Sequence, residues 1–149
     1  MVGAGLGGCT AYDAPSFRVV SITERERSDE AVVLGVAIEA RNRNDEPLPL
    51  QRARYALTLD GQRVFEGTRA ARATAPRFGE QVLELPVVIP ASALPPGQFD
   101  QPGEMTYLIE GTVEYQTPGR LAEFLFDSNV RRPKAPLSLA GTLELPGVE

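Results

Sequence analysis

Side chains that commonly carry out catalysis are scarce in this chain of 149 residues, which contains no histidine and a single cysteine, Cys9. A nucleophile paired with histidine therefore cannot form within the chain, and neither can a zinc site built from cysteine and histidine. Carboxylates are numerous, so a glycosidase-like pair of acids stays open, although no tryptophan is present to bind a sugar ring. We expect no enzymatic activity, no catalytic residues, no metal, no cofactor and no small-molecule substrate.

The first nine residues end in the cysteine and allow three interpretations. The glycine spacing from Gly3 to Gly8 matches a dinucleotide-binding loop, but that loop needs a preceding strand and a following helix, and neither is predicted. Leu6-Gly7-Gly8-Cys9 is similar to a bacterial lipobox, in which the cysteine is acylated. This interpretation requires a signal upstream, because residues 1–5 lack the charged and apolar regions of one. The third interpretation is a glycine-rich tail with an incidental cysteine. We favour the lipobox.

A lipid on Cys9 predicts where the protein is located and what it contacts. It implies a lipoprotein of a bacterial cell envelope, anchored to the membrane. Thr10 rather than aspartate follows the cysteine, which favours the periplasmic face of the outer membrane. Without a signal, the expected location is the cytoplasm. No stretch of the sequence approaches the roughly 20 apolar residues of a membrane-spanning helix.

The charge balance is acidic, with a formal net charge of -5. Nucleic acid is therefore not an expected partner, because neutralising its phosphates requires a basic face. One small basic cluster is formed by Arg131, Arg132 and Lys134. It could contact anionic lipid headgroups, although a solvated loop is the simpler interpretation.

Hydrophobic alternation predicts the elements that would position any site, beginning with a half-buried strand at residues 31–42. Its apolar face consists of Val32, Leu34, Val36, Ile38 and Ala40. Residues 42–50 cannot continue a central strand, because two prolines lack the amide donor and Asn44 and Asp45 favour a turn. Alternation resumes at residues 55–59, and Asp60-Gly61 then predicts a tight hairpin.

Further alternating runs predict strands at residues 17–23, 62–67, 81–89, 105–116, 122–126 and 137–145. Pro86 places its strand at a sheet edge or at a bulge. The charged residues 24–30 predict a solvated loop, and residues 69–73 predict an edge segment or a loop. Residues 90–97 leave room for a single helical turn.

Strands joined by turns, without a long helix, indicate an all-β fold, an antiparallel two-sheet β-sandwich with at most one short helical turn. One apolar and one polar face in each strand favours two sheets packed through their apolar faces. We assign residues 1–16 to a residual signal, lipobox and tether, and residues 17–149 to the sandwich domain.

The order of these features resembles a known family. An apolar strand is followed by Asn42-Arg43-Asn44, by Pro47-Leu48-Pro49-Leu50 and by Tyr55-x-Leu57-x-Leu59-Asp60-Gly61, and then by the strand that starts after Gly79. This series is similar to the WHy domain of late-embryogenesis-abundant type 2 (LEA type 2) proteins, named for water stress and hypersensitive response. The family motif is Asn-Pro-Asn, and Arg43 stands where the family has proline.

The resemblance implies a sandwich similar to a fibronectin type III domain, without enzymatic activity. It further implies an association with desiccation and other stress, and protection of client proteins from aggregation. Bacterial relatives often carry a lipoprotein signal, which agrees with the interpretation of Cys9. An adhesion or assembly module of an envelope or secretion complex, which offers a strand edge to a partner, is the alternative.

The motif residues Asn42 and Asn44 allow two interpretations. They could form a functional site, or they could close a turn through hydrogen bonds from their side chains to the nearby backbone. We favour the turn, because asparagine is suited to this conformation wherever it occurs.

Overall fold

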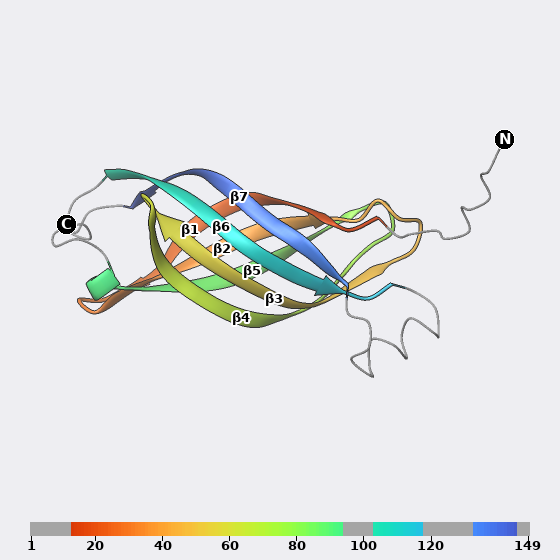
Figure 1. Cartoon of the computed structure of the whole chain (residues 1–149), viewed down its shortest axis with the longest axis horizontal. Helices are drawn as coiled ribbons and strands as arrows, with labels where there is room; N and C mark the ends of the chain where they lie inside the picture. The colour runs from red at the N-terminus through yellow and green to blue at the C-terminus, as the bar shows by residue number, and fades with distance from the viewer. Residues whose placement is uncertain (1–12, 94–102, 118–132, 146–149) are drawn as a thin grey trace.

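The strands stack in two antiparallel layers, as the computed structural model shows for residues 13–93, 103–117 and 133–145 (Figure 1). One sheet has the order β1 (Ser16–Arg27), β2 (Ala31–Arg41) and β5 (Glu80–Pro90). The other has the order β4 (Gln62–Ala75), β3 (Leu48–Leu59), β6 (Gly103–Tyr115) and β7 (Lys134–Leu145). A turn of 3-10 helix, η2 (Ala91–Ala93), follows β5. The predicted all-β, two-sheet sandwich with one short helical turn is confirmed.

The core lies between the two sheets, where the alternation of each strand places its apolar residues. The face of β2 that was predicted to be buried is inaccessible to solvent along its whole length. It packs in the same cluster as inward side chains of the second sheet, which include Leu50, Leu57, Leu59, Ile109 and Val113. Burial of these two apolar faces is the main contribution to stability, because apolar area removed from water contributes about 25 cal/mol per Å².

Tyr55 of β3 joins the two sheets. Its hydroxyl donates a hydrogen bond to the carbonyl oxygen of Pro86 in β5, at 2.6 Å. Burial raises the pKa of this phenol to about 12, and Arg69 opposes the shift. Gly111 of β6 lies opposite Tyr55, and the strands approach so closely there that a Cβ would collide with the backbone carbonyl of Arg54. Packing between β3 and β6 therefore requires glycine at this position.

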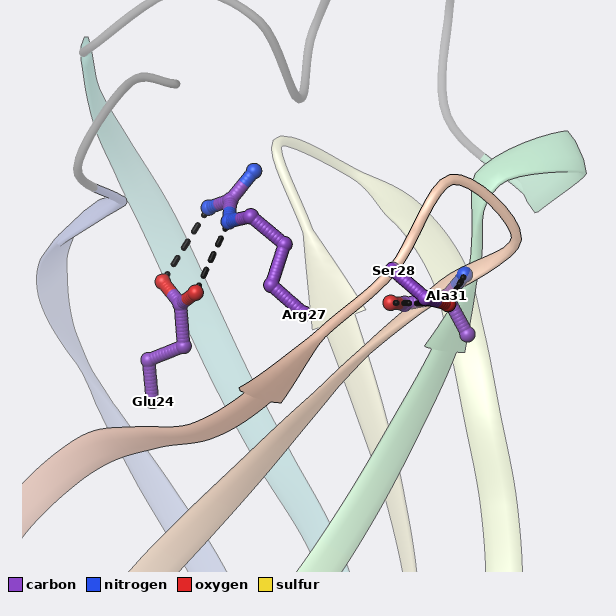
Figure 2. A network of polar contacts seen from close by, with 4 residues as sticks. All are labelled: Glu24, Arg27, Ser28 and Ala31. Atoms are coloured by element: carbon purple, nitrogen blue, oxygen red, sulfur yellow. Dashed lines mark hydrogen bonds and ion pairs between the residues drawn. The ribbon is translucent and has the colours of Figure 1, made fainter. Parts of the chain in front are cut away.

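β1 is longer than the strand predicted at residues 17–23, because it continues to Arg27 through residues expected to form a loop. Its register against β2 shifts at Val20 and at Arg25, which are bulges that turn the strand. Beyond the first bulge, Glu24 pairs with Arg27, whose Nε lies 2.7 Å from a carboxylate oxygen (Figure 2). This hydrogen bond lowers the pKa of the Glu24 carboxyl, against a smaller effect of burial. The expectation of a loop was wrong for these residues because the pair satisfies both charges within the strand.

β3 starts at Leu48, so the expectation that residues 42–50 form only a turn was wrong at its end. Pro49 is the second residue of the strand. Its carbonyl oxygen accepts a hydrogen bond from the backbone N–H of Gln116, at 3.0 Å. A proline is compatible with a strand near its start, where few ladder bonds need its missing donor.

β4 forms a hairpin with β3 through Asp60 and Gly61, as predicted. Both residues have positive φ, 46° and 84°, which a tight two-residue turn requires. β4 then continues to Ala75, so residues 69–73 are an edge strand and the alternative of a loop was wrong. The register shifts near Arg72, whose φ is 46°. This bulge lets the long strand bend without ending.

Each sheet ends in two edge strands, and all four are interrupted. β5 contains Pro86, which confirms the predicted edge position, and β7 contains Pro136. β1 has its bulges at Val20 and Arg25, and the register of β4 shifts at Val64 and near Arg72. Prolines and bulges prevent the edge of a sheet from pairing with another chain. Among the described strands, no edge therefore offers a long, regular row of backbone donors and acceptors.

Three predictions concern residues that the structure does not describe. They are the strand at residues 122–126, the lipid on Cys9, and the part of the basic cluster formed by Arg131 and Arg132. Lys134, the third member of that cluster, is the first residue of β7. These assignments stay predictions from the sequence.

Candidate functional site

Asn42 joins two connections at one end of the sandwich. It is the one polar side chain that is fully buried among the described residues, with 0% of its surface exposed. Its Nδ2 donates hydrogen bonds to the carbonyl oxygens of Glu46, Ala75 and Pro76, at 2.8, 3.2 and 3.1 Å. Its Oδ1 accepts from the backbone N–H of Asn44, at 2.9 Å. The amide therefore links the β2–β3 connection to the end of β4. Below, the Asn42 end means residues 42–47, residues 76–79 and Asp13, the first described residue of the segment that precedes β1.

Asn44 holds the chain that precedes β1. Its Nδ2 donates to the carbonyl oxygen of Asp13, and its Oδ1 accepts from the backbone N–H of the same residue, both at 2.9 Å. The side chain thus pairs with Asp13 as a neighbouring strand would. Its Nδ2 also donates to Oδ1 of Asn42, at 2.9 Å. The path of the chain from Asp13 into β1 is fixed at the Asn42 end.

Arg43, the third residue of the family motif, lies between these asparagines but is exposed and takes no part in their network. It lines a shallow depression of about 180 Å³ together with residues of β1 and β2: Ser16, Phe17, Arg18, Glu39 and Arg41. Arg18 and Glu39 form an ion pair across this depression, at 2.6 Å, which raises the pKa of the guanidinium. The structure therefore brings Asn42 and Asn44 together and separates Arg43 from them.

Phe78 projects from the turn between β4 and β5. Its side chain is 68% exposed, more than any other large apolar side chain of the described residues. Its φ of 52° is one that residues with a Cβ rarely adopt. The backbone is held by hydrogen bonds, from Phe78 N to Asn44 O at 3.0 Å and from Asn42 N to Gly79 O at 2.8 Å. No pattern in the sequence points to this residue, because the positive φ follows from contacts with the distant residue Asn44.

A second candidate lies on the outer face of the larger sheet. A groove of about 330 Å³ is lined by side chains from β4, β3, β6 and β7: Arg52, Arg54, Thr68, Thr112, Glu114 and Lys134. Glu114 lies opposite both Arg52 and Lys134 in the sheet register, so a carboxylate stands between the cations. This arrangement is typical of a solvated, charge-paired sheet face.

The described ranges contain no group of three acidic, cysteine or histidine side chains that could hold a metal ion. In the same ranges, no helix is long and apolar enough to cross a bilayer. What the Asn42 end offers is a hydrogen-bonded surface with one exposed aromatic side chain, Phe78.

A family model described as late embryogenesis abundant protein (LEA_2) matches residues 37–145. This range covers the motif residues and six of the seven strands in whole or in part. No curated protein sequence gives a significant match.

Solved structures share the fold at low sequence identity. The solution structure of an Arabidopsis thaliana protein has a TM-score of 0.71 and 17% identity, over 94% of this chain and 87% of that one. A candidate late embryogenesis abundant (LEA) protein, also solved in solution, has a TM-score of 0.66 and 17% identity, over 97% and 77%. A crystal structure of a protein from Archaeoglobus fulgidus has a TM-score of 0.56 and 13% identity, over 89% and 100%. These likenesses concern the fold alone.

Proposed function

Because the chain belongs to the late embryogenesis abundant family LEA_2, we propose that it is a WHy-type, non-enzymatic stress-protective domain held at a bacterial cell envelope by a lipid on Cys9. Family membership makes it a LEA-like, stress-related domain. The proposal adds the envelope, the anchor and the mode of action. In that mode, the folded sandwich lies between client proteins or along a membrane during water loss and keeps apolar surfaces apart.

The observation that carries the protective role is that all four edge strands are interrupted. A protective protein must be concentrated beside partly unfolded clients without pairing its own strands with theirs. Pro86 in β5 and Pro136 in β7 remove backbone donors from two edges, and bulges disturb the other two. The same observation counts against the alternative, an assembly module that binds a partner by adding a strand, because such binding uses a regular edge.

Drying a client enzyme in the presence of the domain tests this role. The recovered activity and the light scattering after rehydration are compared with those of an inert protein of equal mass and net charge. We expect more activity and less aggregate with the domain, at equal mass. Protection no greater than that of the inert protein would contradict the proposal.

The anchor is tested separately in cells. A labelled fatty acid should be incorporated into the protein expressed with its upstream sequence, and Cys9→Ser should abolish incorporation. The wild-type protein should sediment with membranes, and the variant should not. An unlabelled wild-type protein would show that Cys9 is an ordinary thiol.

A further inference from the structure

The exposed phenylalanine of the Asn42 end has no packing role that explains its conformation. Phe78 does not belong to the hydrophobic core or to the residues packed against it. Its positive φ would suit glycine or asparagine better, and the side chain is mostly in water. An aromatic side chain held outward on a hydrogen-bonded turn is suited to enter an apolar or interfacial environment outside the protein.

One residue holds both this side chain and the incoming chain. The backbone carbonyl of Asn44 accepts from Phe78 N–H at 3.0 Å, and the side chain of Asn44 pairs with Asp13. Figure 1 shows the start of β1 and the β2–β3 and β4–β5 connections at the same end of the elongated sandwich. Cys9 precedes Asp13 by four residues, which span at most about 14 Å when extended. A group attached to Cys9 therefore stays close to Phe78.

We propose that the Asn42 end is the membrane-facing end of the domain and that Phe78 enters the interfacial region of the bilayer. This inference rests on the proposed lipid at Cys9, which brings the end within reach of the membrane. The anchor makes the contact intramolecular, so one aromatic side chain is sufficient to orient the domain although it could not recruit the domain by itself. The long axis of the sandwich then points away from the bilayer.

The charges at this end indicate an apolar rather than an electrostatic contact. Arg77 is exposed in the turn, Arg43, Asp45 and Glu46 are exposed on the neighbouring connection, and Asp13 is exposed before β1. This end therefore has two cations and three anions, and without a net positive charge it has no net attraction to an acidic lipid surface. We expect the contact to form on zwitterionic phosphatidylcholine and to change little with salt.

The composition of the chain allows a direct test. It has one cysteine and no tryptophan, so both an anchor and a fluorescent probe can be placed uniquely. Cys9 is coupled to a maleimide phospholipid in phosphatidylcholine vesicles that contain brominated acyl chains, and Phe78→Trp reports the environment of the turn. The matched control is Val88→Trp, since Val88 is 44% exposed near the opposite end of β5. Circular dichroism verifies that both variants are folded.

We expect the emission of Phe78→Trp to shift to the blue and to fall at least about twofold in brominated vesicles, while Val88→Trp stays unquenched. Adding Asn44→Ala to Phe78→Trp releases Asp13 and should reduce the quenching. Equal quenching of the two probes, or none of either, would overturn the inference. Quenching that requires anionic lipid or low salt would overturn its apolar character.

The failure of this inference differs from a failure of the proposed anchor. Coupling at Cys9 is chemical and does not depend on acylation in the cell. Fatty-acid labelling without quenching of Phe78→Trp would leave the anchor standing and refute the membrane-facing end. Quenching of Phe78→Trp without fatty-acid labelling would show that the Asn42 end can contact a bilayer although the cell does not anchor the protein. The inference that this end faces the membrane in the cell would then fall together with the proposed anchor.

Discussion

Replacing Asn42 tests whether a buried amide, in addition to hydrophobic packing, stabilises one end of the sandwich. Asn42→Ala removes the donor to the carbonyl oxygens of Glu46, Ala75 and Pro76, and the acceptor for the N–H of Asn44. The carbonyl of Pro76 keeps the N–H of Gly79 as a donor, so three backbone groups lose this partner. At about 1 kcal/mol for each group, the free energy of unfolding should fall by about 2–3 kcal/mol. A domain has roughly 5–15 kcal/mol of stability, so the variant should still fold, with a Tm lower by about 10 °C.

Urea unfolding followed by far-UV circular dichroism measures this loss. The matched control is Gln51→Ala, which removes a partly exposed amide with one longer hydrogen bond, from Gln51 Nε2 to Gln116 Oε1 at 3.3 Å. The control should cost less than about 1 kcal/mol. If the two variants differ by less than about 1 kcal/mol, the network around Asn42 does not stabilise the fold as argued.

Asn42→Asp keeps the shape of the side chain but replaces the amide NH2 donor with a carboxylate oxygen, which is an acceptor. An ionised carboxylate would face three carbonyl oxygens in a buried position, so its pKa is raised in the folded state. The folded protein then binds a proton that the unfolded protein has lost. The penalty of the substitution is therefore smallest below the pKa of the unfolded carboxyl, about 4, and grows as the pH rises toward the folded pKa. A penalty that is equal at pH 4 and pH 7 would refute this account.

Three further predictions concern other parts of the fold. Tyr55→Phe leaves the carbonyl of Pro86 without its donor, so the free energy of unfolding measured by urea titration should fall by about 1–2 kcal/mol. No change would mean that water replaces the hydroxyl. Gly111→Ala forces β3 and β6 apart and should reduce the yield of folded protein or cost several kcal/mol, and a variant with wild-type Tm would contradict the close approach. NMR titration should find the pKa of the Glu24 carboxyl below its ordinary value, and Arg27→Gln should return it toward that value. Because the pKa is lowered in the folded state, the pair stabilises the fold at pH values above the unfolded pKa. This contribution is lost as the pH falls through the folded pKa.

The sandwich could be predicted because its strands alternate strongly. In β2, every second residue is apolar from Val32 to Ala40, and a shift by one residue would expose the whole face, so the sequence determines which side is buried. The hairpin at Asp60 and Gly61 was predictable for a local reason, since only a few residue types tolerate positive φ.

The misjudged boundaries have a common physical cause. Residues 24–27 are charged, and their place in a strand depends on pairing with β2 and on the ion pair of Arg25 with Glu84 of β5, 59 residues away. The continuation of β4 past Arg72 depends on a bulge against β3, which lies some 20 residues earlier in the sequence. Such tertiary contacts override local propensity, and a single sequence does not display them.

The candidate site was predictable only in part. The motif residues Asn42 and Asn44 could be selected from the sequence, together with a turn formed by their side chains. Two features could not be predicted, because they join distant segments: the pairing of Asn44 with Asp13, 31 residues away, and the outward position of Phe78. Both depend on how the two sheets place their connections at one end.

The two ends of the sandwich differ in what accompanies their ion pairs. Beside the Asn42 end, the Arg18–Glu39 pair is accompanied by the hydrogen bonds of a buried neutral amide to backbone carbonyls. At the other end, Glu24 and Arg27 form an ion pair whose side chains are 22% and 19% exposed, and such a pair weakens as ionic strength rises. When a cell dries, its solutes become concentrated, so we expect the molecule to loosen first where β1 turns into β2, because the bonds of the buried amide at the Asn42 end do not depend on the screening of charges. Loss of water would then act on this domain as a directional signal, with fraying that starts at the end remote from Asn42.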